Sequence, residues 1–222
     1  MLNIKENIKI LDFFKILDDE NLNKLSKLVT INSYPAHYIF YYEEDMKDKL
    51  YFLVDGLMKS YKVDRFDNEI FLNHIYSNTL ISEISSLHDD QIYCSSNTEF
   101  LKESIVLEIN YGVFKKHFID TNILTMQLMN EIINKSKQLY CIIDREIVFD
   151  ATAKVAYTLY DDLKMFNKLK RQDVANMLHI QPATLSRILQ KLVRQGIIET
   201  ESMQVRIQKK DELKKIFNGC RL

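Results

Sequence analysis

The sequence has no tryptophan, and only two prolines, four glycines and three cysteines occur among its 222 residues. Without Gly-, Ser- or Pro-rich stretches, it offers no flexible linker and no glycine-rich loop that could cradle a phosphate. Cys94, Cys141 and Cys220 are odd in number, have no CxxC spacing and do not pair with histidines, which argues against a disulfide framework and a zinc site. The sequence therefore predicts a reduced protein without a metal site.

Long hydrophobic runs and targeting signals are also missing. No stretch approaches the about 18 uncharged apolar residues that span a membrane, and the N-terminal MLNIKENIKILDFF mixes charged with apolar residues. We therefore expect a cytoplasmic protein with no membrane partner. Motifs typical of enzymes, such as Gly-x-Ser-x-Gly, HExxH, HxH or a phosphate loop, do not occur either, so we do not expect an enzyme.

The chain as a whole is nearly neutral, but its basic and acidic residues are distributed unevenly along the sequence. The 30 Lys and Arg residues nearly cancel the 31 Asp and Glu residues, for a net charge of −1. Residues 150–222 hold 14 basic and 8 acidic residues, a balance of +6, whereas residues 1–149 carry −7. Because 46% of the residues are hydrophobic, the chain can bury a core, and its two oppositely charged regions are expected to meet different partners.

Period-two patterns dominate between residues 29 and 110. Short segments rich in Ile, Val, Tyr and Phe are separated by turn residues such as Asp55-Gly56 and Asp67-Asn68. The expected strands are Val29–Tyr34, Tyr38–Tyr42, Leu50–Val54, Leu57–Val63, Glu69–Ile75, Gln91–Ser96 and Glu99–Asn110, after two short helices within Leu11–Leu28. Seven or eight short strands are typical of a barrel or jelly roll.

A long amphipathic helix is predicted over Thr121–Val148. One apolar stripe consists of Leu124, Leu128, Ile132, Leu139 and Ile142, and a second consists of Met126, Met129, Ile133, Tyr140, Ile143 and Ile147. A helix of this length is about 40 Å long, more than is needed to cover one face of a small barrel. We expect Leu128, Ile132, Leu139 and Ile142 to contact a second copy of the chain. Burial of the helix between two domains is the alternative, and the other stripe could also form the dimer seam.

The last third of the chain has the spacing of a helix-turn-helix. Asp150 is a good N-cap for a helix over Ala151–Phe166, and helices Arg171–Leu178 and Pro182–Gln195 follow, with Pro182 suited to the first helical position. The apolar skeleton of the motif consists of Val174, Ala175, Leu178, Ile180, Leu185 and Ile188. A generic three-helix bundle without a ligand is the alternative interpretation of this spacing.

The outward face of the second helix carries small and hydrogen-bonding residues, which a reader of the DNA major groove requires. These residues are Ala183, Thr184, Ser186, Arg187 and Gln190. After Gly196, strands Ile197–Thr200 and Met203–Ile207 would form a wing, and a closing helix starts at Asp211. Lys170, Arg171 and Arg206 are the expected phosphate contacts.

From Phe13 to Ile216 the chain resembles the transcription regulators of the Crp/Fnr family. YPAHYIFYYEED and LYFLVDGLMKSY, with Gly56, resemble strands of the family's barrel, and RQDVANML, TLSRILQKL and GIIE resemble its DNA-binding signature. The resemblance implies an α+β fold, with an effector-sensing, cyclic-nucleotide-binding-like β-barrel or jelly roll over residues 1–120, a dimerisation helix over 121–149 and a winged helix-turn-helix over 150–222. It also implies a homodimer that binds a near-palindromic operator in double-stranded DNA and activates transcription by contacting RNA polymerase.

Two departures from the family pattern affect the DNA-reading part. Where the family usually carries a Glu before Thr, an apolar residue, Ser or Gly, and Arg, this chain has Ala183. A carboxylate accepts a hydrogen bond from cytosine N4, whereas an alanine methyl contacts the thymine methyl, so we expect an A·T preference opposite Ala183. Arg187 matches the arginine that binds guanine. His179 replaces the usual glycine and is interpreted as a turn residue.

The resemblance also locates a possible effector pocket, formed by Ser82, Glu83, Ile84, Tyr93 and Cys94. Members of the family that bind cyclic nucleotides follow a Gly-Glu-Leu segment with an Arg-Ser or Arg-Thr pair, whose place is taken here by Tyr93 and Cys94. No arginine lies between Arg65 and Arg145, and burying a phosphate without a positive partner is costly, so cyclic AMP is not expected.

The cysteines and histidines decide which other sensing mechanisms the sequence allows. An iron–sulfur cluster would need a group of N-terminal cysteines, and none precedes Cys94, which excludes that sensor. Haem with an axial ligand among His37, His74, His88 and His117, a thiol sensor at Cys141 or Cys94, and activity without any effector stay open. The alternative function is a ligand-binding module whose C-terminal bundle docks on a protein and not on DNA.

Overall fold

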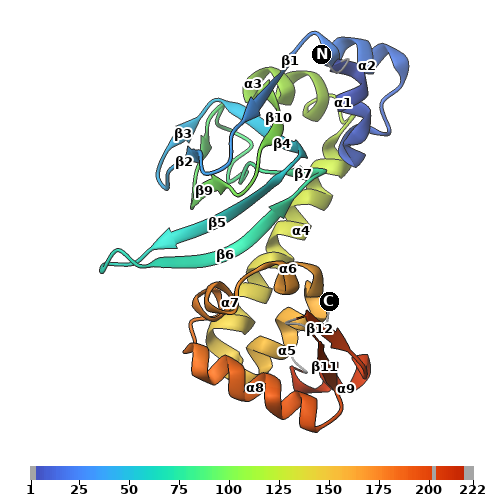
Figure 1. Ribbon diagram of the computed structural model, residues 1–222. Helices are drawn as coiled ribbons and strands as arrows, with labels where there is room; N and C mark the ends of the chain where they lie inside the picture. Colours follow the sequence, from blue (N-terminus) through green and yellow to red (C-terminus); the bar gives the residue numbers. More distant parts are fainter. Residues whose placement is uncertain (1–3, 202–203, 218–222) are drawn as a thin grey trace. The chain divides into compact units, whose positions relative to one another are not determined.

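The computed structural model describes residues 4–201 and 204–217 (Figure 1). By its internal contacts the chain divides into two compact units, Met1–Ser136 and Lys137–Leu222. The boundary falls inside one long helix, α4 (Thr125–Ile143). Within the described ranges, no helix is long and apolar enough to cross a membrane.

Two four-stranded antiparallel sheets and one two-stranded ribbon build the N-terminal unit (Figure 1). The sheet orders are β1-β10-β4-β7 and β2-β9-β5-β6, and the ribbon is β3-β8. The strands are β1 (Val29–Tyr34), β2 (Ile39–Tyr41), β3 (Met46–Lys47), β4 (Lys49–Asp55), β5 (Leu57–Val63), β6 (Glu69–Tyr76), β7 (Thr79–Leu80), β8 (Ile92–Tyr93), β9 (Asn97–Phe100) and β10 (Ser104–Asn110). The expected α+β class with an N-terminal jelly roll is confirmed.

Strands β3 and β7 were not expected from the sequence, and the largest differences in strand length occur at two places. The strand expected over Gln91–Ser96 shrinks to the two residues of β8. The expected strand Glu99–Asn110 is divided between the end of β9 and the whole of β10, because residues 101–103 form a bend. The Ser104 hydroxyl stabilises this bend by donating to the Lys102 carbonyl at 2.8 Å. Alternation of apolar residues therefore located the sheets well and overestimated individual strands.

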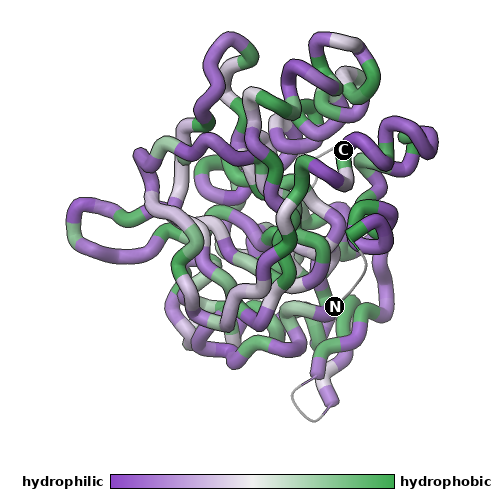
Figure 2. Tube along the Cα trace, turned by 90° about the horizontal axis from the view of Figure 1, so that it is seen from above, coloured by the Kyte–Doolittle hydropathy of each residue, from purple (hydrophilic) through white to green (hydrophobic). Residues whose placement is uncertain are grey.

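Two tight turns connect the strands β4, β5 and β6. Gly56 between β4 and β5 has a φ of 142°, which side chains rarely tolerate, and a Cβ at this position would collide with Ser104. The β5–β6 hairpin closes through Asp64, whose Oδ1 accepts hydrogen bonds from the N–H groups of Phe66 and Asn68 at 2.7 and 3.0 Å. Figure 2 shows this hairpin loop, at the left of the view, as a mostly hydrophilic segment.

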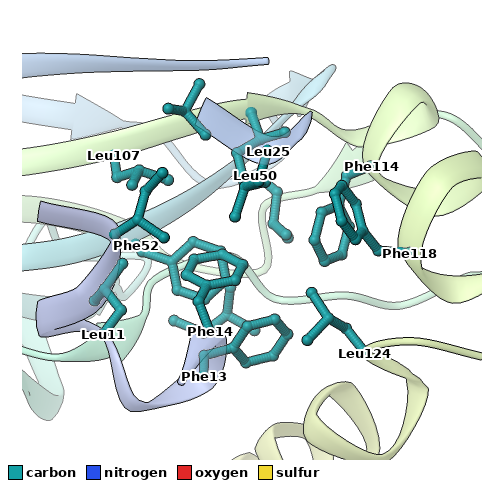
Figure 3. Close-up of a cluster of buried hydrophobic side chains, with 14 of the residues drawn as sticks. Leu11, Phe13, Phe14, Leu25, Leu50, Phe52, Leu107, Phe114, Phe118 and Leu124 are labelled. Atoms are coloured by element: carbon teal, nitrogen blue, oxygen red, sulfur yellow. The ribbon is translucent and has the colours of Figure 1, made fainter. Parts of the chain in front are cut away.

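The main core of the N-terminal unit lies between the β1-β10-β4-β7 sheet and the helices that flank it in sequence. These helices are α1 (Ile4–Ile10), the 3₁₀ turn η1 (Asp12–Phe14), α2 (Asp19–Ser26), α3 (Tyr111–Phe114) and the π-helical turn η2 (Lys115–Ile119). Figure 3 shows Phe13 and Phe14 converging on Phe52, and both ring-to-ring centroid distances are 4.9 Å. Helix α1, which contributes the buried Ile8, was not anticipated from the sequence.

Helix α4 starts four residues later than predicted and ends in a π-helical turn, η3 (Asp144–Val148). Its start is delayed because Asn122 adopts a φ of 60° and the Leu124 N–H donates to the Phe118 carbonyl. Leu128 is 2% exposed and packs in the core of its own chain beside Leu124. The prediction that Leu128 lies in a seam between two chains is therefore wrong, because this unit already buries its side chain.

The C-terminal unit is a helical domain closed by a β-hairpin (Figure 1). Its elements after η3 are α5 (Ala151–Asp161), α6 (Leu163–Lys168), α7 (Arg171–Met177), α8 (Pro182–Arg194), β11 (Ile198–Glu201), β12 (Gln204–Ile207) and α9 (Lys210–Ile216). Asp150 caps α5 as predicted, accepting a hydrogen bond from the Ala153 N–H at 2.8 Å.

The helix expected over Ala151–Phe166 is divided into α5 and α6. Asp162 leaves the helical region, with φ −140° and ψ 68°, and its carboxylate accepts a hydrogen bond from the Met165 N–H at 2.9 Å, which caps α6. The break lets Phe166 reach the buried core of this unit, where it is fully covered. The part of the expected wing strand at Met203 lies outside the described residues.

Candidate functional site

Helices α7 and α8 pack against one another through the apolar side chains that the spacing predicts. Val174, Ala175, Leu178, Leu185 and Ile188 are all buried and belong to one core cluster. The small side chain of Ala175 stands where the helices approach, and its carbonyl accepts a hydrogen bond from the Ile180 N–H at 3.0 Å. This is the packing of a helix-turn-helix.

The turn between α7 and α8 has a left-handed residue at its centre. His179 has a φ of 53°, and its N–H donates to the Asn176 carbonyl at 3.0 Å. Its side chain is exposed. The interpretation of His179 as a turn residue, which takes a conformation that glycine adopts more easily, is confirmed.

Helix α8 begins at Pro182, which occupies its first turn as predicted. Gln181 precedes it in an extended conformation, and its carbonyl accepts hydrogen bonds from the N–H groups of Thr184 and Leu185 at 2.9 and 3.1 Å. The inner face of α8 is buried through Leu185, Ile188, Leu189 and Leu192. The geometry therefore fixes one face of α8 in the core and leaves the other in solvent.

The solvent face of α8 carries the residues predicted to read bases. Ala183, Ser186, Arg187 and Gln190 are exposed, and Thr184 is half-buried. Among the residues that the structure describes, the Arg187 guanidinium has no ion-pair or hydrogen-bond partner, so its donors are available to a ligand. The small side chains of Ala183 and Ser186 lie on the N-terminal side of Arg187, which is exposed.

A groove with a volume of about 580 Å³ runs along one flank of α8. It is lined by Arg171, Pro182, Leu185, Ser186, Leu189, Gln190, Val193, Arg194 and Thr200. Arg171 reaches it from α7 with its guanidinium 4.7 Å from the ring centroid of Phe166, a cation–π contact that holds the side chain in place. The groove thus combines polar and apolar atoms with two arginines, Arg171 and Arg194, which suits an anionic polymer.

Strands β11 and β12 form the hairpin predicted as a wing. They pair from Ile198 with Ile207 to Glu201 with Gln204. Arg206 projects from β12 with a 69% exposed side chain, and its Nη1 lies 3.4 Å from the Glu201 carboxylate. Lys170, at the start of α7, is also exposed. The three predicted phosphate contacts, Lys170, Arg171 and Arg206, thus differ in exposure, with Arg171 the most covered.

In the N-terminal unit, the segment expected to form an effector pocket is held by internal hydrogen bonds. Ser82 is buried, and its hydroxyl accepts from the Tyr51 N–H at 2.9 Å. The Glu83 carboxylate accepts from the Ser95 N–H at 3.0 Å and from the Ser96 hydroxyl at 3.1 Å. Ser96 also lies 2.8 Å from the hydroxyl of Ser60 on β5. These hydrogen bonds hold the loop before β9 to Glu83.

The remaining members of this predicted pocket face different surroundings. Ile84 packs against the main core, and Tyr93 is 40% exposed on β8. Cys94 is buried in the second core cluster of the unit, and burial raises the pKa of its thiol to about 12. A thiol with such a pKa carries almost no thiolate at neutral pH, so Cys94 is a poor redox sensor. The five residues therefore do not form one polar site: Ser82 is bonded to the Tyr51 backbone, and Glu83 to Ser95 and Ser96.

Lys135 of α4 brings a positive charge to this region that the search for arginines missed. Its ammonium donates to the Ile81 carbonyl at 3.2 Å, and the carboxylates of Glu83 and Glu131 attract it. Burial is the largest influence on Lys135 and lowers its pKa below the ordinary value of 10.5. Lys135 lies 54 residues after Ile81 in the sequence, and no spacing rule could have paired the two.

Within the described ranges, no group of three or more His, Cys, Asp or Glu side chains could hold a metal ion. His37, considered as an axial ligand, has a φ of 65° and lies 3.4 Å from the Glu99 carboxylate. Cys220 lies outside the described residues, and Cys141 is half-buried on α4.

Comparison with known protein families identifies the kind of domain in the C-terminal unit. Residues 153–216 match the family model of the Crp-like helix-turn-helix domain. The matched segment contains α7, α8 and the wing. A sequence search of curated proteins finds no match.

Solved structures extend the likeness to the N-terminal unit. FixK2 from Bradyrhizobium japonicum is 18% identical, with 85% of this chain and 97% of that chain covered and a TM-score of 0.66. A mutant CooA from Carboxydothermus hydrogenoformans is 16% identical, with 90% and 94% covered and a TM-score of 0.71. A regulator of the crp/fnr family from Eubacterium rectale is 13% identical, with 95% and 100% covered and a TM-score of 0.63.

The chain has the fold of the Crp/Fnr regulators and carries a Crp-like helix-turn-helix domain. The resemblance inferred from the sequence is thereby confirmed. The match to a Crp-like helix-turn-helix domain agrees with the expectation of a regulator and not an enzyme. At identities of 13 to 18%, the likeness to the solved structures establishes the fold.

Proposed function

We propose that the protein is a sequence-specific, DNA-binding transcription regulator of the Crp/Fnr type that reads bases through α8. The observation that carries this proposal is the solvent face of α8, where the Arg187 guanidinium, without a partner among the described residues, lies beside the exposed Ala183, Ser186 and Gln190. A B-DNA major groove, about 12 Å wide, admits an α-helix, and arginine binds guanine O6 and N7 with two hydrogen bonds. Ala183 meets the thymine methyl of an A·T pair.

The flanks of α8 supply the phosphate contacts in this proposal. Lys170 and Arg171 lie at the start of α7, and Arg206 projects from the wing. Residues 150–222 carry a net charge balance of +6, which favours the approach of a polyanion. Phosphate contacts position the unit, and the side chains of α8 then select the sequence.

The protein acts as a homodimer in this proposal, with α4 in the seam. Leu128 turns one face of α4 into the core, whereas Met126, Met129, Ile133, Tyr140 and Ile143 stay exposed at helical spacing. Exposed apolar residues gathered on one helix face are typical of an interaction surface. Ile132 and Leu139, 37% and 60% exposed, flank it, and Ile142 is half-buried. A twofold axis there would place two α8 helices in successive major grooves about 34 Å apart, on a near-palindromic operator.

Regulation works in this proposal through a population shift between two arrangements of the dimer. The link between α4 and α5 at Phe149-Asp150 is extended at Phe149 and gives a place for such a shift. Contact with RNA polymerase and activation in the cytoplasm are proposed from the family resemblance, and repression by occlusion would use the same DNA-binding residues. The effector is a small molecule other than cyclic AMP, or none is needed. Haem at one of the histidines is a further possibility.

The test is selection of bound duplexes from a random DNA pool by the purified protein without any added ligand. An enriched motif with twofold symmetry is the expected result. Enrichment of a motif without symmetry would contradict the dimer, and absence of enrichment with the untreated protein and with cell-extract small molecules would contradict sequence-specific DNA binding. The latter result would favour the alternative, a C-terminal bundle that docks on a protein.

A further inference from the structure

The side chain of Asn167, near the end of α6, forms two hydrogen bonds with strand β12 of the wing. Its Oδ1 accepts from the Val205 N–H at 2.8 Å, and its Nδ2 donates to the Val205 carbonyl at 2.9 Å. The side chain of Gln204 adds a third bond by donating to the Asn167 carbonyl at 3.3 Å. One side-chain amide thus satisfies both backbone groups of a single residue on β12.

This contact takes the place of a third strand. In the described structure the wing is a two-stranded sheet, in which β12 pairs on one edge with β11. A two-stranded ribbon is marginally stable by itself, and the free edge of a strand exposes unpaired N–H and C=O groups. Asn167 covers these groups at the position where the Val205 side chain, 1% exposed, enters the core. The middle of β12 is therefore fixed both by packing and by hydrogen bonds.

The fixed position lies directly beside the arginine expected to contact phosphate. Successive side chains of a strand point to opposite faces, so the burial of Val205 sends Arg206 outward. The Arg206 side chain is long and 69% exposed, and its nearest charged neighbour is Glu201 on the same hairpin. Its reach toward a ligand thus depends on where the β12 backbone is held.

We infer that Asn167 is a positioning residue for DNA binding, which holds the wing so that Arg206 reaches a DNA phosphate. The inference rests on the proposed function. Asn167 itself does not touch DNA in this account, because both polar atoms of its side chain are engaged with Val205. Its contribution to affinity therefore passes through Arg206, and removing Arg206 should remove it.

A double-mutant cycle tests this coupling. The probe is the duplex enriched in the selection described above, titrated at several salt concentrations with the wild type, N167A, R206A and the double variant. Loss of one phosphate contact lowers the slope of log K against log salt by about 0.9. We expect this loss in R206A and most of it in N167A, and we expect the double variant to bind like R206A alone.

Several outcomes would overturn the inference. If N167A binds with the wild-type affinity and slope, the wing does not depend on Asn167. If the effects of N167A and R206A add in the double variant, Asn167 acts by some route other than Arg206. If the wild type shows no salt-dependent binding to any duplex, the proposed function itself fails, a result that differs from both and is seen before any variant is made.

Two further variants separate positioning from folding. Asn167→Asp keeps an acceptor for the Val205 N–H and loses the donor, so its salt slope is expected between those of the wild type and N167A. Gln195→Ala removes an exposed amide at the end of α8 and serves as the matched control with wild-type binding. Thermal unfolding is followed for each variant. If both Asn167 variants are unfolded at the assay temperature, Asn167 is a folding residue and the positioning role is overturned.

Discussion

The carboxylate of Glu83 accepts a hydrogen bond from the backbone N–H of Ser95 across 3.0 Å. Its second oxygen is engaged by Ser96, and the nearby ammonium of Lys135 is held by the Ile81 carbonyl. Glu83, which matches the Glu of the family's Gly-Glu-Leu segment, therefore already has partners, and the sequence has no arginine between Arg65 and Arg145 that could bind a phosphate.

We predict from this that cyclic AMP does not stabilise the protein. A ligand present at 100 times its Kd stabilises the folded state by about 2.7 kcal/mol, which would raise the melting temperature by several degrees. Thermal unfolding with and without about 1 mM cyclic AMP should give the same curve, since even a Kd of about 10 μM would be detected at that ratio. A rise of several degrees would contradict the role of Glu83 in holding the loop before β9.

Arg187→Ala should weaken specific binding. The guanidinium is exposed and unpaired in the described structure, so its loss should cost about 1–3 kcal/mol of affinity and relax selectivity at one base pair. Lys191→Ala is the matched control, since it removes one exposed positive charge from the same helix. The ratio of the affinity for specific DNA to that for non-specific DNA is compared between the two variants. If both variants lower this ratio equally, Arg187 contributes only its charge and does not read a base.

Ala183→Glu should change the selected sequence at one position of each half-site. A carboxylate there accepts a hydrogen bond from cytosine N4, whereas the alanine methyl contacts thymine. Repeating the selection with this variant should exchange an A·T preference for C·G at that position and leave the positions read by Arg187 unchanged. An invariant C·G already present in the wild-type motif would contradict the role given to Ala183.

A charge placed on the exposed face of α4 should dissociate the dimer. Ile133 is 46% exposed and turned away from the core that buries Leu128, so Ile133→Glu puts a carboxylate in the proposed seam. Sedimentation velocity should then report a monomer, whereas Asn134→Glu, one residue along and also exposed, should stay dimeric. If only Leu139→Glu dissociates the protein, the seam is centred on the neighbouring stripe.

Glu108 should make the N-terminal unit sensitive to acid. Burial by itself would raise the pKa of Glu108, but hydrogen bonds from Asn32, Tyr34 and Lys49 outweigh it and hold this pKa below the ordinary 4.5. A lowered pKa gives stability that is present above about pH 4.5 and is lost as the pH falls through the folded-state value. Glu108→Gln should cost about 1–3 kcal/mol at pH 7, because buried donors lose a charged partner.

The measurement for Glu108 is chemical unfolding of wild type and Glu108→Gln between pH 3 and pH 7. The gap between the two unfolding free energies should shrink as the pH falls. Glu20→Gln, at an exposed position of α2, is the control and should follow the wild type throughout. A gap that stays constant with pH would show that Glu108 does not hold its charge in the way described.

The sequence predicted those features that depend on neighbouring residues. Alternation of apolar side chains located the sheets, and the Ala175, His179 and Pro182 spacing located the helix-turn-helix, because both patterns are local. The break at Asp162 was missed since a capping aspartate inside an apolar helical pattern looks like a surface residue. Leu128 was misplaced because periodicity shows that a face is apolar and does not show which partner covers it.

Contacts between residues far apart in the chain could not be predicted from the sequence. Asn167 meets Val205 across 38 positions, and Lys135 meets the Ile81 carbonyl across 54. Neither pair belongs to a motif with fixed spacing, and both depend on how the units fold in three dimensions. Charge counting found the basic C-terminal region, yet it could not tell the half-buried Arg171 from the exposed Arg187.

The central claim is that α8 recognises a specific DNA sequence, while contacts between basic side chains and DNA phosphates contribute to the affinity. The most direct measurement is the Kd of the wild type for the selected duplex and for a shuffled duplex of the same composition, at about 50 to 200 mM salt. We predict that the selected duplex binds at least about 10³-fold more tightly and that both affinities fall steeply with salt. Equal affinity for the two duplexes, or binding that does not change with salt, would contradict the claim.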